Sequence, residues 1–272
     1  MRFKPLITAT LSTMATATVL GILPSSASAF TLAKMSGSWD NVDLTNGLTV
    51  GSNGVAPNSN NFVEFLTVDD ESQVRWGNPP GSDNSSGRKS GLGFTGESDI
   101  DIAVGQVFNI GKLRHFNNPI YTPLGTQVDF SLNMEFADIG LENQSFDFVF
   151  NIDETRNNQS VCPYATDAGK GCSDSITWEQ SIASSNTFAF EGEEYALELV
   201  GFSSTPNSEM LLQQFISQEQ ETSEAYIFAQ IAKVDKPNED DPEKVPEPSA
   251  MVGVALLGTY FVSRRCKQQS VI

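Results

Sequence analysis

A single histidine, His115, limits the chemistry that this chain can carry out. A catalytic triad, or a metal site that needs histidine, can use no other residue, and no nucleophile-elbow motif accompanies it. The residues that follow, Asn117, Asn118 and Pro119, indicate a polar turn at the end of a strand, where an imidazole usually hydrogen-bonds to backbone groups. We therefore predict that the protein is not an enzyme. His115 and Asn117 are ligand-binding candidates, secondary to this structural interpretation.

Adjacent carboxylates are a second candidate for catalysis. Asp153 with Glu154, or Glu193 with Glu194, would be the acid and base of a glycoside hydrolase. With 34 Asp and Glu in the chain, such pairs arise by chance, and neighbours on a strand point to opposite faces of a sheet. Glycoside hydrolysis is therefore the least favoured function.

Carboxylates on loops suggest calcium, the one cofactor that we consider. Two groups offer hard oxygen ligands between predicted strands: Asp69, Asp70 and Glu71, and Asp99 with Asp101. Neither group has EF-hand spacing. We favour the interpretation of these residues as solvated loops.

Trp76 is the candidate for carbohydrate binding, because aromatic rings stack on sugars and this residue opens a Gly- and Pro-rich loop. Isolated tryptophans such as Trp39, Trp76 and Trp178 usually belong to the core of a sandwich. A carbohydrate-binding module, stabilised by calcium or not, is thus the alternative function. It requires an exposed Trp76.

Gly91, Gly93 and Gly96 match the Gly-x-Gly-x-x-Gly pattern of dinucleotide-binding proteins. No helix or βαβ unit follows, so we discard this function and expect the glycines to form a turn or a bulge beside Phe94.

Two cysteines of the body, Cys162 and Cys172, are separated by a short segment that contains Pro163, Gly169 and Gly171. In an exported protein they are expected to form a disulfide. A zinc tetrad is disfavoured, because no histidine or further cysteine lies near them in the sequence.

Hydrophobic alternation predicts an all-β fold. Apolar residues alternate with polar ones over Val128 to Phe136 and again over Phe146 to Ile152, which indicates two neighbouring antiparallel strands. A helical spacing is seen only over Ser208 to Ile216. The pattern favours a single antiparallel β-sandwich of jelly-roll type. The other predicted strands are Phe62 to Val68, Gln73 to Trp76, Val107 to His115, Asp174 to Trp178, Phe188 to Phe190, Tyr195 to Phe202 and Ala225 to Val234.

The N-terminal segment, residues 1–29, has the three parts of a signal peptide. Arg2 and Lys4 precede an uncharged apolar stretch, and small residues end it. We expect signal peptidase to cut between Ala29 and Phe30. The sandwich domain would then occupy residues 30–235.

The C-terminal segment begins with a Pro-rich acidic stalk, residues 236–248, which ends in Pro246, Glu247 and Pro248. An apolar segment follows at 249–263, and a basic tip at 264–272 carries Arg264 and Arg265. The uncharged run of 14 residues from Ser249 to Val262 would span about 21 Å as a helix, less than the ~30 Å hydrocarbon core of a bilayer.

These three parts resemble the PEP-CTERM sorting tail, which exosortase-type transpeptidases recognise in Gram-negative bacteria. The resemblance implies a transmembrane sorting helix that is processed near Pro248, after an inner-membrane intermediate. The basic tip favours a topology in which the tip stays inside and the body outside.

Charge limits the partners. Between the two terminal segments, 11 Lys and Arg stand against 34 Asp and Glu, a formal charge of −23. Such a body repels phosphate backbones, which excludes nucleic acid as a partner.

The body resembles the choice-of-anchor K domain. The resemblance is carried by Val74 to Gly77, by Ser90 to Gly96, and by His115 to Ile120. Arg114 departs from it, because a threonine is expected before the His-Phe-Asn of that motif. The family implies a surface domain of unassigned activity. We therefore expect an exported, non-enzymatic protein of the cell envelope, cell surface or extracellular matrix, with extracellular polysaccharide as a partner.

Overall fold

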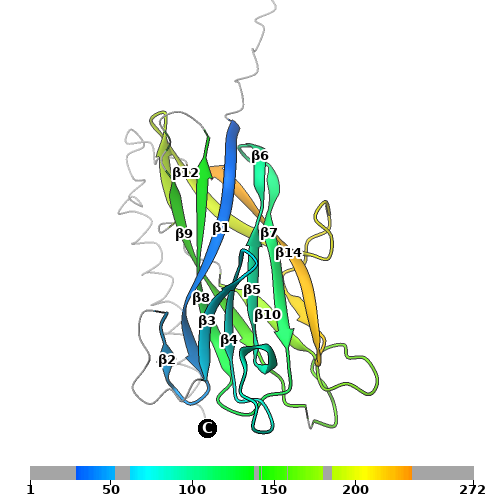
Figure 1. Cartoon of the computed structure of the whole chain (residues 1–272). Helices are drawn as coiled ribbons and strands as arrows, with labels where there is room; N and C mark the ends of the chain where they lie inside the picture. Colours follow the sequence, from blue (N-terminus) through cyan, green and yellow to red (C-terminus); the bar gives the residue numbers. More distant parts are fainter. Residues whose placement is uncertain are drawn as a thin grey trace, which may run out of the picture.

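The protein is an all-β sandwich built from two antiparallel sheets, as seen in a computed structural model (Figure 1). The structure describes residues 29–52, 62–137, 141, 143–157, 159–179 and 186–234. The predicted signal peptide up to residue 28, the stalk, the apolar segment and the basic tip lie outside the described residues. In the described part, the prediction of an antiparallel sandwich is confirmed.

The first sheet contains seven strands. In spatial order they are β13 (Phe215–Ser217), β10 (Asp174–Trp178), β9 (Gln144–Asp153), β8 (Gly125–Phe136), β1 (Ala29–Leu44) and β2 (Thr49–Val50), and β6 (Ser98–Ala103) also pairs with β1.

The second sheet also has seven strands. Their order is β11 (Thr187–Phe190), β12 (Glu193–Ser203), β14 (Glu221–Lys233), β7 (Val107–Asn117), β5 (Ser90–Gly96), β4 (Glu71–Trp76) and β3 (Val63–Val68). A short 3₁₀-helix, η1 (Ser86–Arg88), precedes β5.

The alternating strands behave as predicted. In β8 the side chains of Val128, Phe130, Leu132 and Met134 are buried, and in β9 those of Phe146, Phe148 and Phe150 are buried. The two strands pair antiparallel, with Phe130 opposite Phe148. Their apolar faces require a second layer, which the other sheet provides.

β1 was not among the predicted strands, although it is the longest and runs along most of the sandwich (Figure 1). Its register against β8 shifts between Leu32 and Lys34 and again between Trp39 and Val42. These irregularities break the two-residue period of its buried side chains, so sequence alternation does not reveal it.

The helical spacing over Ser208 to Ile216 does not correspond to a helix. The segment contains bends, an isolated bridge from Leu212 to Phe202, and the start of β13. Among the described residues no α-helix occurs.

The expectation of a turn or bulge at the glycine motif is also wrong, because Gly91, Gly93 and Gly96 lie inside β5. A Cβ on Gly91 would overlap the carbonyl oxygen of Val74, and one on Gly93 would overlap the Glu71 carboxylate. Glycine is therefore required at these positions because atoms of the neighbouring strand β4 come too close for a side chain.

Gly91→Ala is expected to lower the free energy of unfolding by about 1–3 kcal/mol, because overpacking forces the β4 backbone to move. Gly87→Ala is the matched control, since a Cβ there meets nothing within 4 Å. Urea denaturation of both variants tests this. Equal stability of the two variants would contradict the close-approach explanation.

Candidate functional site

A cluster of polar side chains lies between the two sheets, at the end of the sandwich where β4, β7 and β9 finish. The second sheet contributes Trp76, the last residue of β4, and His115 near the end of β7. The first sheet contributes Glu154, directly after β9, and Asp174, the first residue of β10. The fold thus brings together residues that are far apart in the sequence.

The members of this cluster are close enough to act on one another. Trp76 Nε1 donates a hydrogen bond of 2.6 Å to Glu154 Oε1. The Trp76 and His115 rings are stacked, with centroids 6.3 Å apart. One potential ligand atom from each of His115, Glu154 and Asp174 lies within 4.8 Å of the other two.

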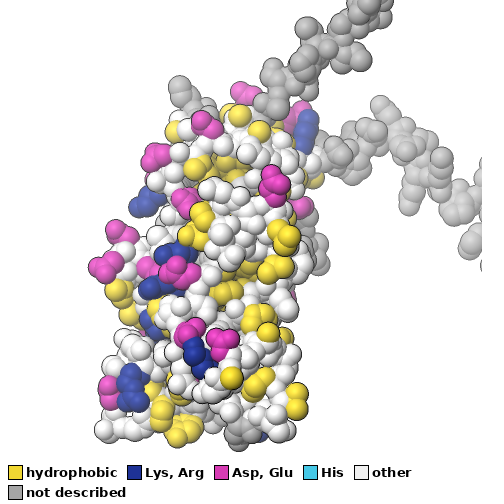
Figure 2. Space-filling view, turned by 90° about the vertical axis from the view of Figure 1, so that its right-hand side faces the viewer, with side chains coloured by type: hydrophobic (Ala, Val, Ile, Leu, Met, Phe, Trp, Pro, Cys, Tyr) yellow, Lys and Arg dark blue, Asp and Glu magenta, His cyan; other side chains and the backbone are white. Residues whose placement is uncertain are grey.

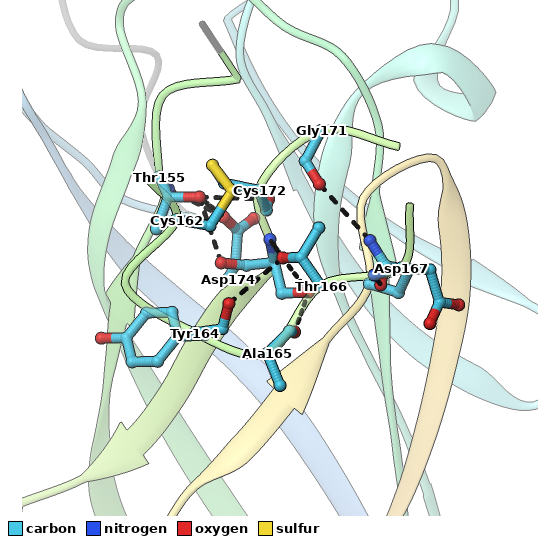
Figure 3. The surroundings of a disulfide bond; sticks show 11 residues. Thr155, Cys162, Tyr164, Ala165, Thr166, Asp167, Gly171, Cys172 and Asp174 are labelled. Atoms are coloured by element: carbon cyan, nitrogen blue, oxygen red, sulfur yellow. Dashed lines mark hydrogen bonds between the residues drawn. A yellow bond between two sulfur atoms is a disulfide. The ribbon is translucent and has the colours of Figure 1, made fainter. Parts of the chain in front are cut away.

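The disulfide predicted between Cys162 and Cys172 is confirmed. It closes the loop that leads from β9 to β10, next to the cluster (Figure 3). Thr155 N donates a 2.7 Å hydrogen bond to Asp174 Oδ1, and Thr155 Oγ1 lies 3.1 Å from Cys172 O. The closed loop therefore holds Asp174, and Glu154 beside Thr155, in position.

Burial disfavours charge on the members of the cluster. Desolvation, and then the charge of Asp174, raises the pKa of Glu154 well above its usual value. Desolvation raises the pKa of Asp174 to about 7, although hydrogen bonds from Thr155 and the interaction with the Glu154 carboxyl act against this. Glu219, between β13 and β14, also interacts with both carboxyls, and desolvation raises its pKa. For His115, desolvation and the positive charge of Arg75 lower the pKa to about 3, so the imidazole is neutral at neutral pH.

Several buried polar atoms of the cluster have no hydrogen-bond partner among the described residues. They include both ring nitrogens of His115, Asp174 Oδ2 and Glu219 Oε1. The expectation that the His115 imidazole satisfies backbone groups is therefore not met. Buried polar atoms without partners are rare in proteins and point to a functional or ligand-related role.

The other candidates for ligand binding are also inside the protein. Trp76 is 0% exposed, which removes it as a platform for stacking sugars. Asn117 is equally buried, and its Nδ2 donates to the carbonyl oxygen of Ser217 at 3.1 Å.

The calcium candidates do not converge. Asp69 and Asp70 are exposed in the turn before β4, whereas Glu71 is buried. Asp99 and Asp101 lie on β6 and are exposed. Within the described residues, the group that could hold a metal ion is His115, Glu154 and Asp174 instead.

The adjacent carboxylate pairs diverge as expected for neighbours along an extended chain. Asp153 accepts a 2.6 Å hydrogen bond from the Tyr164 hydroxyl, while the half-buried Glu154 accepts one from the buried Trp76. Glu193 pairs with Lys233 at the surface.

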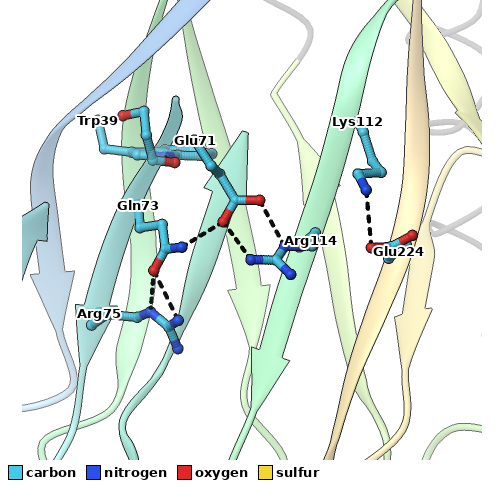
Figure 4. Close-up of polar contacts among 8 residues, drawn as sticks. Trp39, Glu71, Gln73, Arg75, Lys112, Arg114 and Glu224 are labelled. Carbon is cyan, nitrogen blue, oxygen red and sulfur yellow. Dashed lines mark hydrogen bonds and ion pairs between the residues drawn. The ribbon is translucent and has the colours of Figure 1, made fainter. Parts of the chain in front are cut away.

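A second polar network covers the outer face of β4 and β7 (Figure 4). Arg114 binds the Glu71 carboxylate through Nε at 2.7 Å and Nη2 at 2.8 Å, and Gln73 Nε2 also donates to Glu71. Arg75 donates to Gln73 and stacks 3.3 Å above the Phe116 ring. Burial and then the charge of Arg114 lower the pKa of Arg75 to about 10. Arg114, which departs from the choice-of-anchor K motif, thus has an ionic role here.

Sequence reasoning selected His115 and Trp76 but missed the residues that complete the cluster. Glu154 was weighed only as the partner of Asp153, and Asp174 only as the start of a strand. The cysteine pair was the available signal, because it indicates that the segments on either side of the loop lie close together.

Comparisons with known proteins add no assignment. The chain matches no known family model, and no curated protein matches it. The described part of the chain contains no helix with the length and hydrophobicity of a membrane span.

Trp76→Phe is expected to lower the free energy of unfolding by about 1–3 kcal/mol, because it leaves the Glu154 carboxyl without its donor. Trp178→Phe is the matched control, since Trp178 is also buried but its Nε1 has no partner among the described residues. That variant should stay within about 1 kcal/mol of the wild type. Chemical denaturation measures both. A cost for Trp76→Phe no larger than that of the control would contradict the role given to this hydrogen bond.

Replacing Cys162 and Cys172 together by serine is expected to lower the free energy of unfolding by about 2 to 3 kcal/mol, because the unfolded chain regains the freedom of the loop. Cys266→Ser is the control: this cysteine belongs to the basic tip, outside the described residues, so its replacement in the full-length protein should leave stability unchanged. Denaturation of the purified variants, with mass spectrometry after alkylation of the wild type, checks this. Free thiols at both positions in the native protein would refute the pairing.

Proposed function

We propose that the protein is an exported, non-enzymatic component of the bacterial cell envelope, which its PEP-CTERM tail delivers to the cell surface or the extracellular matrix. The disulfide between Cys162 and Cys172 is the observation that carries the proposal. Disulfides persist in oxidising compartments and are rare in the cytosol. A domain that contains a disulfide is expected to function outside the cytoplasm.

The position of the first strand supports cleavage between Ala29 and Phe30. Phe30 is fully buried and packs against Phe136, Phe188 and Tyr195. A cut before it would leave the aromatic anchor of β1 intact.

The ends of the fold agree with a tethered surface protein. β1 begins at one end of the sandwich, where Phe30 pairs with Ile102 on β6. β14 finishes near the same end, where Gln230 pairs with Val107, the first residue of β7. The polar cluster and the disulfide lie at the opposite end, where Glu221 pairs with Asn117. A tail that leaves after β14 would present the disulfide end away from its attachment point.

Burial supports a non-enzymatic role. Trp76, His115 and Asn117 are all 0% exposed, so no substrate reaches them in this conformation. Figure 2 shows acidic and basic side chains next to one another on one face of the sandwich, and no histidine is visible there.

The finer assignments belong to the same proposal. They are a jelly-roll type of sandwich, the choice-of-anchor K relationship, exosortase as the processing enzyme, and association with extracellular polysaccharide. The last of these cannot use Trp76. Any sugar would have to bind to other side chains.

Replacing Pro246, Glu247 and Pro248 by alanine is expected to leave the full-length protein in the inner membrane, because the extended recognition segment before the apolar run is lost. The wild type should be shorter and should fractionate with the outer envelope or the medium. Mass spectrometry and fractionation in the native host measure this.

The matched control replaces Asp241, Pro242 and Glu243 by alanine, which alters the same stalk without touching the triplet. It should be processed like the wild type. Equal mass and equal fractionation of the triplet variant and the wild type would overturn the sorting proposal and favour a plain membrane anchor.

A further inference from the structure

We propose that His115, Glu154 and Asp174 form an internal binding site for a divalent metal ion of the zinc class. One potential ligand atom from each residue lies within 4.8 Å of the other two. The site joins the two sheets, because His115 is on β7 and Asp174 is on β10. It is distinct from the loop carboxylates that the sequence suggested for calcium.

The unpartnered buried atoms are the independent sign of a ligand. His115 is 0% exposed, and neither of its ring nitrogens has a hydrogen-bond partner among the described residues. Asp174 is 1% exposed, and its Oδ2 also has no hydrogen-bond partner among the described residues. Leaving such groups unsatisfied costs free energy, and a cation would be bound by one ring nitrogen of His115 together with Asp174 Oδ2.

The donor set favours a metal of the zinc class over calcium. Calcium takes oxygen ligands, whereas an imidazole nitrogen with carboxylate oxygens is typical of zinc and its transition-metal neighbours. Two carboxylates would balance the charge of a divalent ion.

The surrounding hydrogen bonds hold the carboxylates in place as outer partners of metal ligands do. Trp76 Nε1 donates to one oxygen of Glu154, and Thr155 N donates to Asp174 Oδ1 while Asp174 Oδ2 stays unpartnered. Ligand atoms around a tetrahedral zinc, with bonds of about 2.0–2.2 Å, lie about 3.3–3.6 Å apart. Side-chain movements of about an ångström would therefore close the site around the ion.

The test uses the exported protein with its disulfide intact. Because the site is buried, the protein is unfolded in guanidinium without reductant and refolded with either EDTA or one of two metals, Zn²⁺ or Ca²⁺. Metal content after gel filtration and Tm are then measured. We expect one tightly held Zn²⁺ per chain, a higher Tm with Zn²⁺ than with EDTA, and no displacement of Zn²⁺ by excess Ca²⁺.

Two variants locate the ion. Glu154→Gln keeps an acceptor for Trp76 but removes a charged ligand, so zinc affinity should fall about tenfold or more. His115→Phe replaces the imidazole with an apolar ring, so it should lose the ion and yet fold in EDTA. The matched control, Asp99→Asn with Asp101→Asn, removes exposed carboxylates of β6 and should bind zinc like the wild type.

Three results would overturn the proposal. They are a wild type that retains no zinc, equal zinc affinity in the wild type and Glu154→Gln, and tight binding of Ca²⁺ in place of Zn²⁺. Circular dichroism of each variant in EDTA shows that it is folded. If His115→Phe fails to fold, Glu154→Gln alone decides the outcome.

Discussion

The need to satisfy polar groups inside an apolar sandwich constrains this molecule more than any other interaction. Most of the space between the sheets is filled by phenylalanine and aliphatic side chains, which need no partner. At one end, however, the buried His115 and Asp174 and the half-buried Glu154 lie next to Trp76. Burial pushes these groups towards their neutral forms, and several of their atoms have no protein partner among the described residues. The divalent ion that we propose would be bound by one ring nitrogen of His115 and by the two carboxylates.

The two ends of the sandwich are therefore stabilised by different kinds of interaction. At the end where the chain enters the fold, Phe30 makes edge-to-face contacts with Phe136, Phe188 and Tyr195. Such aromatic pairs contribute about 0.5–1.5 kcal/mol each beyond their buried area. At the other end, the disulfide loop and the polar cluster join β9 and β10 to β7. An envelope protein that is tethered at the aromatic end would expose the end that covalent and ionic links reinforce.

Strands in which apolar and polar residues alternate regularly could be predicted from the sequence. β8 and β9 follow strict alternation, and the spacing of Cys162 and Cys172, in a domain that the sequence predicts to be exported, was enough to predict the disulfide. β1 was missed because its register shifts interrupt the alternation. β5 was missed because a glycine-rich sequence usually indicates a loop. Its glycines instead lie in a strand, where neighbouring groups come too close for a side chain. The cluster was only half predictable, since Glu154 and Asp174 meet His115 only through pairing of distant strands. Burial of Trp76 could not be decided from its Gly- and Pro-rich surroundings.

We infer that the cluster of His115, Glu154 and Asp174 holds a metal ion that links the two sheets. A crystal structure of the purified protein, with diffraction data collected on both sides of the zinc absorption edge, tests this most directly. We predict an anomalous peak about 2.0–2.2 Å from a ring nitrogen of His115 and from carboxylate oxygens of Glu154 and Asp174. Ordered water molecules in place of that peak, bonded to the His115 nitrogens and to Asp174 Oδ2, would contradict it.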